Sequence, residues 1–310
     1  MRTGCGYTIK AVKRQENFSV YMSLRMMVNE PTRVAHGRKK APKLGQNFLT
    51  DKSAAKRIVD ALGDISSAVV LEIGPGRGIL TDILVARANK LIAVEIDRML
   101  AVQLRMRYAK TTHVEIVEGD FLAIDLNTLL GPKIGTIADR QHLDLAHARV
   151  IGNLPYYITS DILLRLFSFH HLLESIVIMV QREVADRIAA KPGSRDYGLL
   201  TVTSQFYTDV ENVSTLPPGA FSPPPAVHSS VLRMKIAPKA ATLGVDPQKF
   251  IPFLRLSFGQ KRKTFFNNLK QAYDQERIRE ALSEAELRPD VRAEAVSLEQ
   301  FATVFHALRA

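Results

Sequence analysis

The sequence predicts an α/β fold, in which a Rossmann-like, doubly wound parallel sheet is followed by a small all-α domain at the C-terminus. From residue 69 onward, short apolar strands alternate with amphipathic helices, which is typical of a parallel sheet covered on both faces. A glycine-rich turn directly follows the first of these strands, as in nucleotide-binding sheets. From Pro247 to the C-terminus the apolar periodicity is helical throughout.

Each element is predicted from its local pattern. Apolar runs predict strands at 69–73, 91–96, 114–118, 149–152, 175–181, 207–213 and 229–236. Amphipathic stretches predict helices at 79–88, 98–108, 159–168, 182–190 and 199–205, and three more within "KFIPFLRLSF", "KTFFNNLKQAY" and "LEQFATVFHALRA". Gly, Pro, Asp and His without a clear period predict a surface loop at 131–148, and residues 237–247 are expected to form a linker. The last two strands suggest a hairpin that closes the sheet.

Composition limits the classes of function. The chain of 310 residues has a formal charge of +11 and a pI near 9.8, which favours a polyanionic partner. Residues 1–43 hold ten Lys and Arg against two acids, so we expect residues 1–37 to form a flexible basic arm, with a merely solvated tail as the alternative. The apolar runs are too short to cross a bilayer, and the single cysteine, Cys5, excludes an intramolecular disulfide. We therefore expect a cytoplasmic protein, and since the histidines lack metal-ligand spacing, we predict no metal site.

The stretch "VVLEIGPGRGILT" places Gly74, Gly76 and Gly78 between a strand and a helix. Glycines at this point let the backbone turn sharply and let a ligand approach it closely. A nicotinamide site is the competing interpretation, but its fingerprint is G-x-G-x-x-G, and Ile79 stands where the third glycine belongs. The loop alone is a signal of moderate specificity for a nucleoside cofactor.

Two carboxylates follow the next two strands. In "LIAVEID", Glu95 comes about twenty residues after Gly74, where a carboxylate can accept hydrogen bonds from both hydroxyls of a ribose. Asp97 competes for this role but is more suited to capping the following helix. In "EGDFL", Asp120 is placed to accept from the amine of a cofactor adenine, although an N-cap role is nearly as well supported. Because none of these signals implies pyrophosphate, S-adenosyl-L-methionine is the best candidate cofactor.

The stretch "VIGNLPYYI", residues 150–158, crowds a carboxamide, a proline and two aromatic rings at the end of a strand. A plain turn would account for Asn and Pro by backbone preference alone. The alternative is a site for an acceptor group, and the four residues taken singly leave both interpretations open.

Several motifs together resemble the small-subunit ribosomal RNA adenine dimethyltransferases, in the order of that family. They are "GQNFLTD", "LEIGPGRGILT", "AVEID", "EGDFL", "IGNLPYYITS", "YGLLTV", "FSPPPAVHSSVLRM" and "GQKRKTFFNNL". The resemblance covers about residues 38–310. It implies a class I methyltransferase sheet, with an S-adenosylmethionine-binding catalytic domain at 38–240 and a helical RNA-recognition domain at 241–310. The first 37 residues and the 131–148 loop are longer than the family pattern.

The resemblance also implies roles for single residues. The Asn153 carboxamide oxygen and the Leu154 carbonyl would each accept one hydrogen of an adenine N6 amine, and Pro155, which lacks an amide hydrogen, would shape that turn. Tyr156 and Phe221 would stack on the two faces of a flipped-out base, each stack worth about 1–3 kcal/mol.

Further roles follow for the cofactor and the RNA. Asn47 and Leu49 would close over the methionine end of the cofactor, with Gly74 beneath it, although "QNFLTD" also suits a helix start capped by Thr50 or Asp51. The cations expected to contact RNA phosphates, for which a solvated face is the alternative, are Arg255, Lys261, Arg262, Lys263 and Lys270.

The implied activity is dimethylation of N6 of two adjacent adenosines near the 3′ end of small-subunit ribosomal RNA. We expect a monomer that acts on a pre-ribosomal particle. Two rivals remain: a resistance-type enzyme that methylates adenine in large-subunit RNA, and a ribosome-assembly factor that has lost turnover. A nicotinamide oxidoreductase is a distant third.

Overall fold

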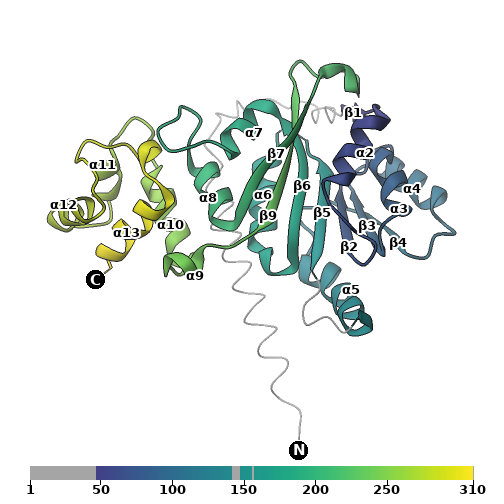
Figure 1. Ribbon diagram of the computed structural model, residues 1–310, viewed down its shortest axis with the longest axis horizontal. Coiled ribbons are helices and arrows are strands. Elements are labelled where there is room, and N and C mark those ends of the chain that lie inside the picture. Colours follow the sequence, from purple (N-terminus) through teal and green to yellow (C-terminus); the bar gives the residue numbers. More distant parts are fainter. Residues whose placement is uncertain (1–46, 142–146, 156, 310) are drawn as a thin grey trace, which may run out of the picture. The chain divides into compact units, whose positions relative to one another are not determined.

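The computed structural model describes residues 47–141, 147–155 and 157–309 (Figure 1). By compactness this part of the chain divides into two units. One contains residues 47–185 and 209–236, and the other contains Asp186–Thr208 and 237–309. The basic arm at 1–37 and Tyr156 lie outside the described residues, and the predicted domain boundary after residue 240 stays a prediction.

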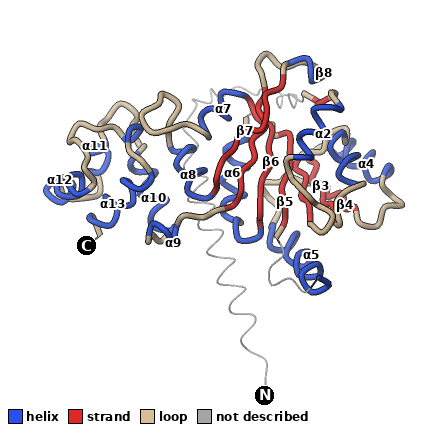
Figure 2. The backbone as a smooth tube through the Cα atoms, viewed as in Figure 1, coloured by secondary structure: helices blue, strands red, loops and turns tan. Residues whose placement is uncertain are grey.

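The first unit is built on a mixed, mostly parallel sheet with helices on both sides, as predicted (Figures 1 and 2). Its strands follow the order β4-β3-β2-β5-β6-β9-β7. Their bounds are β2 (Val69–Ile73), β3 (Lys90–Glu95), β4 (Val114–Glu118), β5 (Ala148–Asn153), β6 (Leu173–Gln181), β7 (Thr208–Leu216) and β9 (Ser229–Ile236). All pairs from β4 to β6 are parallel, whereas β9 runs antiparallel to β6.

The chain order reverses between β2 and β5, which are neighbours in the sheet but not in sequence. At such a switch point a crevice opens beyond the carboxyl ends of the strands. The register brings those ends level, because Ile73 pairs with both Val94 and Gly152, and Glu95 pairs with Glu118. The residues that follow these strands therefore meet at one edge of the sheet.

Helices connect and cover the strands. They are α2 (Lys52–Asp60), α3 (Ile79–Val85), α4 (Arg98–Arg107), α5 (Leu126–Gln141), α6 (Thr159–Ser168) and α7 (Arg182–Ile188). A separate two-stranded sheet pairs β1 (Phe48–Leu49) with β8 (Phe221–Ser222), so segments far apart in sequence lie side by side.

The expected loop at 131–148 is partly wrong, since helix α5 runs through Pro132 to Gln141. Leu126, Leu130 and Ile134 are buried at a spacing of four residues, which gives the helix an apolar stripe. Asp125 accepts from the backbone N–H of Asn127 at 3.2 Å and so supports the first turn. This burial outweighs the helix-breaking tendency of the glycine and proline.

The second unit is helical, as predicted for its C-terminal part. It contains α8 (Leu199–Tyr207), α9 (Ala240–Leu243), α10 (Pro247–Ser257), α11 (Phe265–Leu269), α12 (Gln275–Glu284) and α13 (Leu298–Ala307). Its core is a cluster of aromatic rings in contact: Phe206, Phe250, Phe253, Phe258, Phe265, Phe301 and Phe305. The expected linker at 237–247 contains the short helix α9, and α12, capped by Asp274, was not predicted as a separate helix.

Candidate functional site

A pocket lies at the carboxyl ends of β2, β3 and β5 and beside the residues that follow β4. Its empty volume is about 1160 Å³, including the open solvent at its entrance. The predicted site residues that line it are Asn47, Leu49, Gly74, Gly76, Glu95, Asp120, Asn153, Leu154 and Pro155. Residues from four strand ends and from the β1 segment are thus brought together.

The glycine-rich loop is shaped by close packing on both sides. Gly76 has a φ of +57°, and a Cβ atom there would lie 3.1 Å from the Phe48 ring. Gly78 has a φ of +87°, and its Cβ would lie 2.9 Å from atoms of Arg107 and Leu104. Both positions therefore require glycine for conformation and for space.

Glu95 is held at the end of β3 with its side chain only 2% exposed. Its two carboxylate oxygens accept backbone N–H groups, one from Gly76 and one from Asp97, each at 2.9 Å. Each oxygen keeps a further lone pair, since an ionised carboxylate offers about four acceptor sites. A buried, fixed carboxylate facing the pocket is thus available to a ligand's hydroxyl groups.

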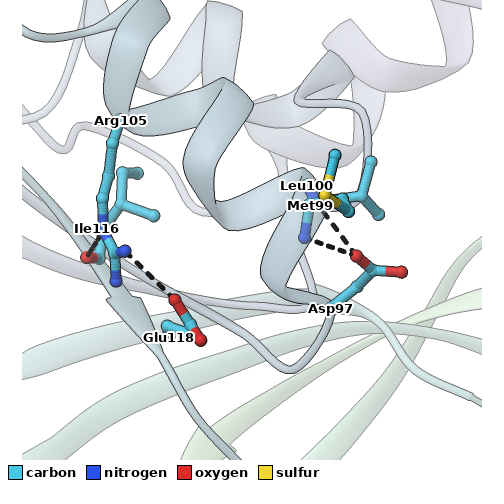
Figure 3. Close-up of polar contacts among 6 residues, drawn as sticks. All are labelled: Asp97, Met99, Leu100, Arg105, Ile116 and Glu118. Atoms are coloured by element: carbon cyan, nitrogen blue, oxygen red, sulfur yellow. Dashed lines mark hydrogen bonds and ion pairs between the residues drawn. The ribbon is translucent and has the colours of Figure 1, made fainter.

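Asp97 has the helix-capping role that the sequence predicts for it. Its carboxylate accepts the backbone N–H groups of Met99 and Leu100, at 2.8 and 3.2 Å, and so begins α4 (Figure 3). Further along α4, Arg105 reaches across to the Ile116 carbonyl and the Glu118 carboxylate of β4. Of these two carboxylates, Glu95 lines the pocket and Asp97 does not, and the binding of a ribose by Glu95 stays a prediction.

Asp120 lines the pocket and is exposed. One of its oxygens accepts from the backbone N–H of Leu122 at 2.9 Å, which stabilises a turn after β4. Helix α5 begins later, at Leu126, so Asp120 is not its N-cap. The other carboxylate oxygen accepts no hydrogen bond within the described part of the chain.

The turn after β5 presents two carbonyl oxygens without internal donors. The Asn153 side chain donates through Nδ2 to the Asn47 carbonyl at 3.1 Å, which fixes the orientation of its carboxamide. Leu154 donates its N–H to Met179 at 3.1 Å. Among the described residues, no donor reaches Asn153 Oδ1 or the Leu154 carbonyl oxygen, and both residues line the pocket.

The Pro155 carbonyl, next along the chain, stabilises the start of α6. Pro155 accepts from the Ile158 backbone and from the Thr159 hydroxyl, both at 3.2 Å, where α6 begins. In "NLPYY", the Pro155 carbonyl therefore stabilises the turn, whereas Asn153 Oδ1 and the Leu154 carbonyl stay the candidate acceptors of a site.

The β1 segment is tied to both sides of the site. Ala220 accepts from the Thr50 backbone at 2.8 Å and from the Thr50 hydroxyl at 3.1 Å, while Asp51 caps α2 through the Ala54 N–H at 3.0 Å. The helix-start interpretation of "QNFLTD" is thus confirmed for Asp51 and wrong for Thr50. Asn47 and Leu49 line the pocket at the same time.

Among the described residues predicted to form the catalytic or cofactor site, Phe221 is the one that does not line the pocket. It is 4% exposed and packs in the apolar core cluster with Leu49 and Leu216. Pairing of Phe221 with Leu49 in the two-stranded sheet leads to this burial. Its stacking on a base stays a prediction, as does that of Tyr156.

The pocket is also lined by residues that the sequence did not mark as site residues, among them Phe48, Glu72, Arg77 and Tyr157. Tyr157 is 66% exposed, and its only sequence signal was its place in "PYY". Glu72, in "LEIG", is 1% exposed and accepts from the Thr81 hydroxyl at 2.8 Å. Burial raises the pKa of Glu72 to about 8, with the nearby Glu95 adding to the effect.

All five predicted RNA-binding cations are exposed on the helical unit. Arg255 lies on α10, Lys261–Lys263 occupy the turn before α11, and Lys270 follows α11. Their contact with RNA stays a prediction. Within the described ranges, no helix is long and apolar enough to span a bilayer, and no three His, Cys, Asp or Glu residues form a metal-binding group.

Comparisons with known proteins identify the family of the chain. Residues 37–310 match the family described as "Ribosomal RNA adenine dimethylase". A protein of Koribacter versatilis (strain Ellin345), named ribosomal RNA small subunit methyltransferase A, is 60% identical over 270 residues, which are 87% of this chain and 95% of that protein. A protein of the same name from Acidobacterium capsulatum is 49% identical over 271 residues, or 87% and 92% of the two chains.

Two solved structures share the fold. The crystal structure of the 23S rRNA methyltransferase ErmE superposes with a TM-score of 0.62 at 26% identity, covering 85% of this chain and all of that one. A dimethyladenosine transferase from Plasmodium falciparum gives a TM-score of 0.65 at 22% identity, covering 83% and 95%.

Proposed function

Because the chain belongs to the ribosomal RNA adenine dimethylase family, we propose that it dimethylates N6 of two adjacent adenosines in the 3′-terminal hairpin loop of small-subunit ribosomal RNA. The proposal includes S-adenosyl-L-methionine as methyl donor and a role in maturation of the subunit. It also includes a pre-ribosomal particle as the substrate, a monomeric enzyme and a cytoplasmic location. The 60% identical relative named for the small subunit supports this choice over the large-subunit alternative.

The pocket fits the proposed cofactor. A buried carboxylate with free lone pairs suits the two hydroxyls of a ribose, and Glu95 offers this at the end of β3. Asp120 has an oxygen available for an adenine amine, and the loop at Gly74–Gly76 leaves the backbone open to a ligand. Bound there, S-adenosylmethionine supplies an electrophilic methyl group on a positively charged sulfur.

One observation carries the proposal: Asn153 Oδ1 and the Leu154 carbonyl are both open acceptors at the pocket. The N6 amine of adenine is a poor nucleophile because its lone pair is delocalised into the ring. Two acceptors that each bind one N6 hydrogen would hold the nitrogen nearer to tetrahedral geometry and direct its lone pair at the methyl group. Because the donor is already activated, orientation and proximity account for the catalysis, and we assign no general base.

The anchor on the Asn153 side chain supports this role. Its Nδ2 donates to the Asn47 carbonyl, so the carboxamide cannot rotate to offer a donor to the base without losing that bond. A carboxamide fixed in this way is pre-organised as an acceptor. Substrate RNA would be bound chiefly through the exposed cations Arg255, Lys261–Lys263 and Lys270 of the helical unit, which we propose as its RNA-recognition surface.

The proposal is tested by incubating purified full-length protein with labelled methyl donor and undermethylated small subunits, with large subunits in parallel. We expect label only in the small subunit, as dimethyladenosine at two adjacent positions. Label in the large-subunit RNA would establish the rival substrate. Absence of label from both, with a cofactor that binds, would leave the non-catalytic assembly factor.

A further inference from the structure

Arg77, in the middle of the glycine-rich loop, is a cation without an acidic partner. It is exposed and lines the pocket, and within the described residues it forms no ion pair. Other arginines of the same unit do, as in the pairs Arg87–Asp60 and Arg105–Glu118. Its guanidinium instead lies over the Phe48 ring, 4.4 Å from the ring centre.

The backbone of Arg77 is fixed from behind. Its carbonyl accepts from Arg107 Nη1 at 3.1 Å. Arg107 in turn pairs with Asp82 at 3.4 Å, and Tyr108 donates its hydroxyl to the same carboxylate. Gly78, directly after Arg77, leaves no space for a side chain against Arg107. The position of the Arg77 side chain is therefore set at both ends, by this network and by the Phe48 ring.

The stack lies beside the proposed reaction centre. Phe48 directly follows Asn47, whose carbonyl holds the Asn153 carboxamide. The walls of the pocket carry the carboxylates of Glu95 and Asp120, so an anion that approaches the pocket meets negative charge there. Arg77 is a cation of this pocket that no carboxylate neutralises.

We propose that Arg77 binds a backbone phosphate of the RNA strand, next to the target adenosine; this inference rests on the proposed function. A base that enters the pocket leaves its flanking phosphates at the rim, where Arg77 is exposed. Stacking on Phe48 occupies the face of the guanidinium and leaves its in-plane N–H donors free, and their fork matches two phosphate oxygens. The carboxylate of the methyl donor is the other anion of suitable chemistry, and the experiment separates the two.

The decisive variant is Arg77→Gln in the full chain, compared with Arg87→Gln. Arg87 lies beyond the opposite end of α3 and outside the pocket lining, so its substitution removes the same charge without touching the site. KM for undermethylated small subunits is measured over a range of salt concentrations, and the cofactor Kd is measured by calorimetry.

For Arg77→Gln we expect KM for the RNA to rise about tenfold near physiological salt. The slope of log affinity against log salt should become shallower by about 0.7–0.9, the value for one lost phosphate contact. The cofactor Kd should stay within twofold. Arg77→Lys, which keeps the charge but not the flat stack, should retain the wild-type slope with a smaller rise in KM.

If Arg77→Gln has the RNA KM and salt slope of Arg87→Gln, the inference is overturned. A rise in the cofactor Kd with the RNA slope unchanged assigns Arg77 to the donor's carboxylate and also overturns it. The wild-type chain is the reference for the proposed function itself, which fails only if that chain transfers no methyl group to small-subunit RNA.

Discussion

Replacement of Glu95 by glutamine tests the cofactor site most sharply. The two carboxylate oxygens accept the N–H groups of Gly76 and Asp97, both at 2.9 Å, on a side chain that is 2% exposed. Glutamine has one oxygen, and its NH2 group would face the second backbone donor. One buried N–H therefore loses its acceptor, which costs about 1–3 kcal/mol of folding free energy.

We also expect the substitution to weaken cofactor binding. In the proposed site a ribose hydroxyl would lose one charge-assisted hydrogen bond, a loss of about 1.5–3 kcal/mol, which corresponds to a rise of roughly 10- to 150-fold in Kd. Calorimetric titration with S-adenosylmethionine measures this directly, and thermal unfolding measures the accompanying loss of stability.

Asp97→Ala is the matched control, since Asp97 lies two residues away and caps α4. We expect it to cost about 1 kcal/mol of stability through the lost cap. The cofactor Kd should stay within twofold of the wild type. Wild-type affinity in Glu95→Gln, or a larger loss of affinity in Asp97→Ala, would refute the assignment of the ribose to Glu95.

Three other substitutions test the remaining parts of the site. Asn153→Ala should lower kcat about 100- to 1,000-fold, the usual effect of losing one pre-organised transition-state contact, while the cofactor Kd changes little. Single-turnover methyl transfer measures this, and near-normal turnover would contradict it. Burial raises the pKa of Glu72 from 4.5 to about 8, so between these values the folded chain holds a proton that the unfolded chain has lost. The free energy of unfolding should therefore fall as pH rises through this window, and Glu72→Gln should lack that slope in denaturant titrations. Replacing Lys261, Arg262 and Lys263 together by glutamine should raise KM for RNA and reduce the salt slope by up to about 2–3 without changing kcat, and an unchanged slope would argue for a solvated face.

The parts of the site that the sequence predicts are those encoded locally. Glu95 ends a strand with a clear apolar pattern and Asp120 comes two residues after the next one, so their position at the sheet edge follows from the alternation of elements alone. The observed strands β2, β4 and β9 have the predicted bounds, and β3, β5, β6 and β7 differ from prediction by no more than a few residues at each end. Helix α5 was missed because its stripe of Leu126, Leu130 and Ile134 competes with Gly131 and Pro132, and burial decides the outcome.

The parts that the sequence does not predict depend on contacts between distant segments. Arg77 and Phe48 meet because β1 crosses the glycine loop, and no local period relates positions 48 and 77. The burial of Phe221 has the same origin. The prolines of its motif, "FSPPPAV", favour a stiff loop, but the pairing of that segment with β1 places the ring in the core. A side chain's direction in such a two-residue strand is fixed by its partner strand, which the sequence does not reveal.

The turn after β5 explains why one short segment can satisfy both structural and chemical demands. A buried carbonyl without a partner is unfavourable, so a fold normally gives each of them a donor. Within the described ranges, the Pro155 carbonyl accepts from two donors where α6 begins, whereas no donor reaches the Leu154 carbonyl. The N–H of residue 155 is two positions after Asn153, where it could reach Asn153 Oδ1 in an Asx-turn, but it is missing because proline has no N–H. If Pro155 were replaced by alanine, the restored N–H would compete for Asn153 Oδ1, so the proline keeps that acceptor open as well as bending the chain.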